Sequence, residues 1–171
     1  MRIGGGAVSI ADVTDREARD LGFVRPIWLR EIRNNRGFVR GVSQPAVSGE
    51  QGHIQLFNPA ASGITGLIFL VRGGLGGTGT GTFRQFNTEL TTDVGAGFNL
   101  DVGAAAAACH LRRQTNAGLL GTEHTDNRMI GNTMYDLTPL WAYELAEGEG
   151  VMFVNATANE SFTVNYYWIE F

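Results

Sequence analysis

From about residue 45 to the C-terminus, the sequence alternates between short apolar runs and turns rich in glycine and asparagine. Many of the apolar residues are branched or aromatic, and such side chains favour strands. Runs that recur at intervals of about 8–12 residues, with little helical pattern between them, are typical of sandwiches and barrels. The chain has 171 residues, enough for one domain with a sizeable core. The sequence therefore predicts an all-β fold, a β-sandwich of jelly-roll type.

The spacing of apolar and turn residues also predicts where the strands lie. Asn58-Pro59 would close a hairpin between the first two strands, and residues 156–160 would close another between the last two. Gly73–Gly81 is expected to be a glycine and threonine loop. The expected strands are 53–57, 64–72, 82–86, 98–102, 104–109 (with a face of small residues), 150–155 and 161–171.

The last expected strand carries large side chains on both faces. Side chains alternate between the two faces of a strand. One face would hold Phe162, Val164, Tyr166 and Trp168, and the other Thr163, Asn165, Tyr167, Ile169 and Phe171. Because both faces carry aromatic rings, we expect the core to cover one face and a partner molecule to cover the other.

The first 44 residues differ from the rest and are expected to form an anchoring arm before a sandwich domain at 45–171. Thr14 and Glu17 fit a capping box, and Gly22 would end the helix, so one short helix is expected at about 15–21. A helix of two turns is marginal in water by itself. The arm is therefore expected to rest on another surface, such as a second subunit.

All 13 basic residues are arginine, and they are unevenly distributed. Residues 1–40 hold eight arginines against five acids, whereas residues 41–171 hold five against twelve. A basic arm would suit docking on an acidic body. The absence of lysine could reflect codon usage, or a surface built for geometrically fixed contacts. The residues expected to bind a partner are Arg16, Arg19, Leu21, Phe23, Arg25, Trp28, Arg30, Arg33, Arg36 and Arg40.

Several other chemistries are disfavoured. The arginines at 30–40 could bind phosphates, but the pI near 5.3 makes nucleic acid an unexpected partner. Gly74–Gly79 matches a dinucleotide-binding pattern without the helix that should follow it, and no cofactor is expected. No apolar run approaches the roughly 20 residues of a membrane helix, and no secretory signal is apparent.

The cysteine and histidines offer little local chemistry. Cys109 is alone, which excludes a disulfide framework, and it is expected to be buried and inert. His53, His110 and His124 lie far apart, so a metal site would need the fold to gather them. A cupin-like metalloenzyme therefore remains the least favoured of three functional hypotheses.

Several segments resemble small virion structural proteins of tailed bacteriophages. Val13–Gly22 resembles their N-terminal V-T-D-R-x-A-R-x-L-G element. Their β-sandwich body is similar to Gln55–Ala60, Arg112–Asn116 and Val154–Ala158, the last lying before the closing aromatic strand. The resemblance implies a non-enzymatic subunit located in the virion, bound to other capsid or tail proteins and to itself, as a homotrimer. It implies either capsid decoration or a place in the tail, collar or fibre.

A host-surface adhesin is the alternative. Aromatic side chains near turns can stack on sugar rings, although core packing is their commoner fate. The residues that could contact a glycan in this way are Tyr135, Trp141 and Tyr143.

Overall fold

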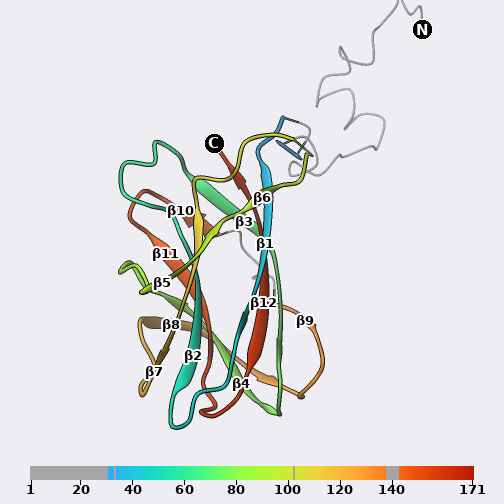
Figure 1. Ribbon diagram of the computed structural model, residues 1–171, viewed down its shortest axis with the longest axis vertical. Helices are drawn as coiled ribbons and strands as arrows, with labels where there is room; N and C mark the ends of the chain where they lie inside the picture. Colours follow the sequence, from blue (N-terminus) through green and yellow to red (C-terminus); the bar gives the residue numbers. More distant parts are fainter. Residues whose placement is uncertain (1–30, 33, 102, 138–142) are drawn as a thin grey trace, which may run out of the picture.

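The computed structural model describes residues 31–32, 34–101, 103–137 and 143–171, without the side chains of 125–128. Within these residues the chain forms strands joined by turns (Figure 1). The strands are β1 (Gly37–Gln44), β2 (Gln51–Phe57), β3 (Gly66–Leu75), β4 (Gly79–Gln85), β5 (Thr92–Ala96), β6 (Phe98–Asn99), β7 (His110–Asn116), β8 (Thr122–Met129), β9 (Tyr135–Asp136), β10 (Tyr143–Leu145), β11 (Gly150–Asn155) and β12 (Phe162–Glu170).

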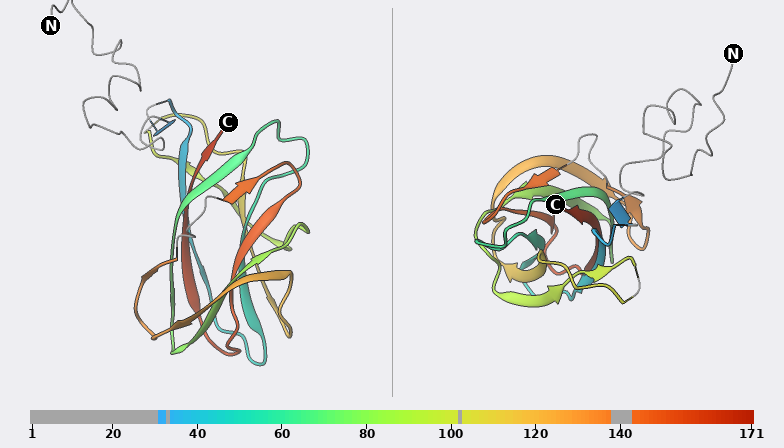
Figure 2. Two further views of the ribbon diagram at one scale, coloured as in Figure 1. Left: turned by 180° about the vertical axis from the view of Figure 1, so that it is seen from behind. Right: turned by 90° about the horizontal axis from the view of Figure 1, so that it is seen from above.

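The strands form two antiparallel sheets that enclose one core (Figure 2). Sheet A has the order β10-β3-β12-β1-β6, with β9 also paired to β3. Sheet B has the order β5-β7-β2-β11-β4-β8. The predicted all-β sandwich is confirmed.

The chain crosses between the two sheets at many of its connections, as from β1 to β2, from β2 to β3 and from β11 to β12. The strands β1, β3 and β12 are neighbours in sheet A, and β2, β4 and β11 are neighbours in sheet B. Both predicted hairpins are therefore wrong, because β2 and β3 lie in different sheets, as do β11 and β12. The turn residues were identified correctly, but each turn spans the gap between sheets instead of returning to the same sheet.

The interior follows the predicted alternation of β12. Phe162, Val164, Tyr166 and Trp168 are at most 2% exposed and belong to the core. The ring of Trp168 stacks on Phe38 at a centroid distance of 5.9 Å. Apolar side chains from both sheets thus meet in one interior layer, which is the main source of stability in a sandwich.

Sheet A begins inside the range expected for the arm. β1 pairs with β12 along its whole length, from Gly37 opposite Ile169 to Gln44 opposite Phe162. Phe38 and Val42 point into the core and are each 5% exposed. The glycine and arginine residues between them mask this alternation in the sequence. The expected helix at 15–21 lies outside the described residues.

Two other expectations about local structure were wrong. Most of the expected Gly73–Gly81 loop is strand, because β3 extends to Leu75 and β4 begins at Gly79. Glycine is needed at Gly74, where a Cβ would collide with the carbonyl of Thr133. Residues 104–109 form an irregular segment before β7 instead of a strand. Hydrogen bonds from two of its amides to the Glu170 carboxylate hold this segment in place.

Candidate interaction surface

The outer face of sheet A carries apolar side chains that the rest of the described chain covers only in part. Val39 of β1, Tyr167 of β12 and Leu70 of β3 lie side by side in register, and all three are half-buried. Leu67 is also half-buried, and the ring of Phe69 contacts that of Tyr167 at a centroid distance of 6.4 Å. The expected second apolar face of β12 therefore exists.

This apolar band continues to one end of the sheet. Phe98 of β6 pairs with Val39 and is 64% exposed, and Phe171 after β12 is 46% exposed. Ile169 is fully buried in the same region. Gly37, opposite Ile169, must lack a side chain because a Cβ would collide with Ile32. Ile32, just before β1, therefore lies beside the outer face of sheet A.

Loops of the same chain cover the outer face of sheet B. The amide of Gln55 donates hydrogen bonds to the carbonyls of Phe86 at 2.6 Å and Thr88 at 3.1 Å. Its Oε1 accepts a hydrogen bond from the Leu90 amide at 3.0 Å. Leu90 and Met152 are 2% and 0% exposed, respectively. Sheet B therefore has a small second core, and sheet A differs from it in this respect.

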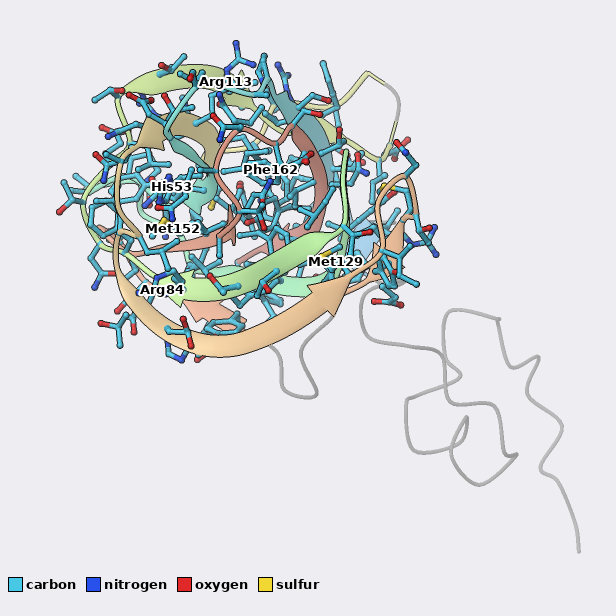
Figure 3. All side chains as sticks on the ribbon, turned by 90° about the horizontal axis from the view of Figure 1, so that it is seen from below. His53, Arg84, Arg113, Met129, Met152 and Phe162 are labelled. Carbon is cyan, nitrogen blue, oxygen red and sulfur yellow. The ribbon has the colours of Figure 1, made fainter. Side chains whose placement is uncertain are left out.

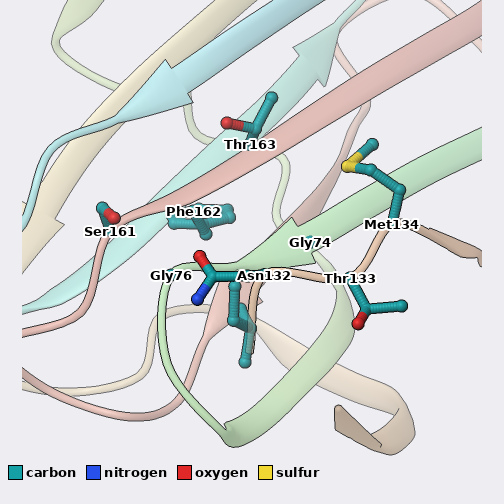
Figure 4. A pocket seen from close by; sticks show the side chains of 9 residues that line it. Gly74, Gly76, Asn132, Thr133, Met134, Ser161, Phe162 and Thr163 are labelled. Atoms are coloured by element: carbon teal, nitrogen blue, oxygen red, sulfur yellow. The ribbon is translucent and has the colours of Figure 1, made fainter. Parts of the chain in front are cut away.

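A shallow groove lies at the opposite end of sheet A (Figure 4). Its volume is about 330 Å³, and it lies between the turn at 132–134 and the start of β12. Met134 beside it is 51% exposed, and nearby Ile130 is 66% exposed. The lining combines hydroxyl, amide and thioether groups with backbone, and the lining residues are Gly74, Leu75, Gly76, Asn132, Thr133, Met134, Ser161, Phe162 and Thr163.

Several arginines hold backbone carbonyls of their own chain. Arg40 donates to the carbonyls of Val94 at 2.6 Å and Ala96 at 3.0 Å, and its guanidinium stacks on Phe98. Arg113 donates to the carbonyl of Ser43 at 2.7 Å. A guanidinium presents several donors in a fixed plane, whereas a lysine ammonium is a point charge. This use of arginine favours the structural explanation for its preference over lysine.

Arg84 of β4, in sheet B, shows the same behaviour. It donates to the carbonyls of Leu120 at 2.6 Å and Gly121 at 2.8 Å, and to the Glu123 carboxylate at 2.7 Å. The turn that it holds also covers His53, because the Leu120 amide donates to His53 Nε2 at 3.3 Å. Figure 3 shows His53 and Met152 close together, to one side of Phe162.

The structure describes only two of the expected partner-binding residues. Arg36 is exposed, with its guanidinium 3.6 Å from the carboxylate of Glu31. The guanidinium of Arg40 already donates to two backbone carbonyls of β5, so a partner would have to displace these two hydrogen bonds to bind it. The other expected residues lie outside the described part: Arg16, Arg19, Leu21, Phe23, Arg25, Trp28, Arg30 and Arg33.

Two of the three expected glycan-contact residues, Tyr135 of β9 and Tyr143 of β10, lie in short strands that pair with β3. The hydroxyl of Tyr135 accepts a hydrogen bond from the Ile130 amide at 2.8 Å. Tyr143 stacks on Phe83 at a centroid distance of 6.0 Å and meets His124 edge-on at 5.6 Å. Both tyrosines are half-buried and pack against the core, which limits the ring area open to a sugar. Trp141 lies outside the described residues.

The histidines occupy separate strands, with His53 in β2, His110 in β7 and His124 in β8. His110 Nδ1 lies 3.6 Å from the carboxylate of Asp93. In the part of the chain that the structure describes, no three His, Cys, Asp or Glu side chains are grouped so that they could hold a metal. The same residues contain no helix long and apolar enough to cross a bilayer.

Burial of His53 predicts a pH-dependent stability. Burial, opposed by hydrogen bonding to the Gln51 carbonyl, lowers the pKa of His53 to about 4. The unfolded state binds this proton near pH 6.5, so native stability falls as the pH drops from about 6.5 toward 4. We expect a loss of about 2 kcal/mol between pH 7 and 5, measured by urea denaturation. His53→Gln should remove this slope, whereas the exposed-site control His124→Gln should keep it; equal slopes would contradict the assignment.

The thiol of Cys109 is expected to be unreactive in the folded protein. Cys109 is fully buried, and burial together with the nearby Glu170 carboxylate raises the pKa of its thiol far above the usual range. Since the thiolate is the reactive form, a thiol-specific reagent should label the native protein far more slowly than the urea-unfolded protein. Labelling at comparable rates would show that the 104–109 segment opens readily.

The apolar residues of β1, β3 and β6 on the outer face were missed as candidate interaction residues. Of this surface, the sequence identified only the β12 side chains, because only β12 could be assigned two faces. The apolar run from Leu67 to Leu70 was a usable signal, since it leaves no polar face for solvent. Comparison of the chain with protein-family models, curated proteins and solved structures found no match.

Proposed function

We propose that this chain is a non-enzymatic structural subunit of a tailed-bacteriophage virion, attached to the capsid or tail through its N-terminal arm and assembled through its sandwich. The single observation that carries the proposal is the sandwich with one sheet apolar on both faces, where Ile32, just before β1, lies beside the outer face. The resemblance of Val13–Gly22 to phage virion elements supports the class of particle.

The polar side chains of the body also suit a scaffold. Arg40 and Arg113 bind carbonyl oxygens of β5 and β1, whereas Arg84 binds those of the turn at 120–121. Gln55 binds the carbonyl of Phe86, and the Glu170 carboxylate accepts from the Cys109 amide. These groups tie strands and connecting segments to one another, as a subunit that bears load within a particle requires.

Deleting residues 1–22 tests the attachment. The truncated chain should keep the thermal transition of the body, because these residues precede every described strand, yet it should no longer co-sediment with particles. The full-length chain, expressed in the same infected cells, is the control. Normal incorporation of the truncated chain would refute the anchoring role of the arm.

A host-glycan adhesin is the second candidate, and the groove beside Met134 is the observation that favours it. The groove offers hydroxyl and amide groups from Asn132, Thr133, Ser161 and Thr163, which suit the hydroxyls of a sugar. A glycan array probed with the full chain should show saturable binding that Thr163→Val weakens. A silent array with folded protein would exclude this candidate.

A further inference from the structure

We infer that a second copy of this chain covers the outer face of sheet A, so that the copies form a closed head-to-tail ring. This inference rests on the proposed structural subunit and adds the surface and the geometry of its self-assembly. It starts from the difference between the two sheets, since loops of the same chain cover sheet B, whereas sheet A has half-buried Val39, Leu70 and Tyr167.

The size of this face suits a contact between folded proteins. β12 has nine residues, which span about 30 Å, and four neighbouring strands span about 15–19 Å. The flat, projected area of this face is about 500 Å², and its side chains add further accessible surface. A stable contact buries about 800 Å² on each partner. The face therefore supplies most of one side of such a contact, and Phe98 extends it.

The composition of the face also suits a folded partner. Its centre is apolar, with Val39, Leu70 and Tyr167 in one row across three strands. Polar groups lie farther along the same strands at Asn165 and Thr163. An apolar centre with a polar rim is the usual anatomy of a protein interface.

The two margins of the face carry opposite net charge. At the β1–β6 margin, two arginines of the margin itself and the guanidinium of Arg113, which reaches Ser43 from β7 of sheet B, lie with two acids. The β9–β10 margin holds two acids against one arginine. The charged residues at the first margin are Arg36, Arg40, Arg113, Glu31 and Asp101, and those at the second are Asp136, Glu144 and Arg72. Complementary margins favour the first margin of one copy against the second margin of the next.

Repeating such a head-to-tail contact around an axis produces a ring. Gly37, Ile169, Leu67 and Glu144 are successive partners in one row across the sheet. Arg36 precedes Gly37, so it lies near the opposite end of this row from Glu144. In a ring, Arg36 of one copy would therefore approach Glu144 of its neighbour. The resemblance implies three copies.

Light scattering on the full chain tests whether the face mediates assembly. The unmodified chain should form one discrete oligomer of at least three copies. Leu70→Glu should raise the dissociation constant by about 100-fold or more, because a carboxylate would be buried in the contact. Leu119→Glu is the matched control, since Leu119 is 39% exposed in the turn near sheet B, and it should leave the oligomer intact.

Phe98→Ser provides a second test that does not risk unfolding, because Phe98 is 64% exposed. It should weaken the oligomer while the thermal transition stays within a few degrees of the unmodified chain. A monomeric unmodified chain, as would result if residues 1–30 cover the face instead, overturns the inference. Equal behaviour of Leu70→Glu and Leu119→Glu also overturns it.

Disulfide trapping tests the head-to-tail geometry, because the one native cysteine is buried. A mixture of Arg36→Cys and Glu144→Cys chains should form mixed disulfide dimers under oxidation, and neither chain alone should form them efficiently. Efficient trapping of Glu144→Cys with itself would contradict the pairing of opposite margins. A two-fold contact with its axis parallel to the strands would also pair opposite margins, so a dimer by light scattering would overturn the ring. If the oligomer forms as expected but never joins particles, the virion function fails while this inference stands.

Discussion

Replacing Glu170 with alanine is expected to lower the free energy of unfolding by about 3–5 kcal/mol. The Glu170 carboxylate accepts hydrogen bonds from the Trp168 indole, the Ala108 amide and the Cys109 amide, each at 2.9 Å. Glu170 is 8% exposed, so water cannot easily replace the carboxylate. Its removal leaves three donors without an acceptor and frees the 104–109 segment from β12.

Glu147→Ala is the matched control for this prediction. The carboxylate of Glu147 accepts hydrogen bonds from the amides of Ala61 and Gly63, but it is exposed. Water can take its place, so the cost should be about 1 kcal/mol or less. Urea denaturation followed by tryptophan fluorescence measures both variants. Similar decreases in the free energy of unfolding for the two variants would mean that water reaches the Glu170 site more easily than its 8% exposure indicates.

Tyr166→Phe is expected to cost about 2–4 kcal/mol, although only one oxygen is removed. Tyr166 belongs to sheet A and is fully buried, yet its hydroxyl accepts from the Phe153 amide at 2.9 Å and donates to the Ile54 carbonyl at 3.0 Å. Both of these residues belong to sheet B. The hydroxyl therefore links the sheets, and its loss removes two hydrogen bonds from inside the core.

The neighbouring residue offers a control with the same chemical change. Tyr167 is half-buried and faces outward, so Tyr167→Phe should change the stability by about 0.5 kcal/mol or less. Burial raises the pKa of Tyr166 beyond the usual range, so its phenol should stay protonated in alkali that ionises ordinary tyrosines. Equal stability of the two variants would contradict the role of the Tyr166 hydroxyl.

Local patterns were sufficient to predict the two faces of β12 and the position of the turn after β2. The alternation of β12 correctly assigned Phe162 and Trp168 to the core and Tyr167 to the outer face, because side-chain direction in a strand follows from residue number alone. Asn58-Pro59 was correctly identified as a turn for a similar reason. Turn chemistry depends on the residues within the turn.

Long-range pairing was not predictable in this way. The turn between β11 and β12 has ordinary turn residues, and nothing in it shows that the chain crosses from sheet B to sheet A. β1 was hidden because glycine and arginine residues surround its two core side chains, Phe38 and Val42. The partners of β1, which are β12 and β6, lie more than 50 residues away in sequence.

The sequence by itself determined that this chain is an all-β sandwich and that β12 carries apolar side chains on both faces. These features depend on composition and on a two-residue period, which are local. Only the tertiary structure decided that loops cover sheet B while sheet A keeps an outer apolar band, and that Glu170 and Tyr166 hold distant segments together. Those features depend on which strands become neighbours, and that choice is made by the packing of the whole core.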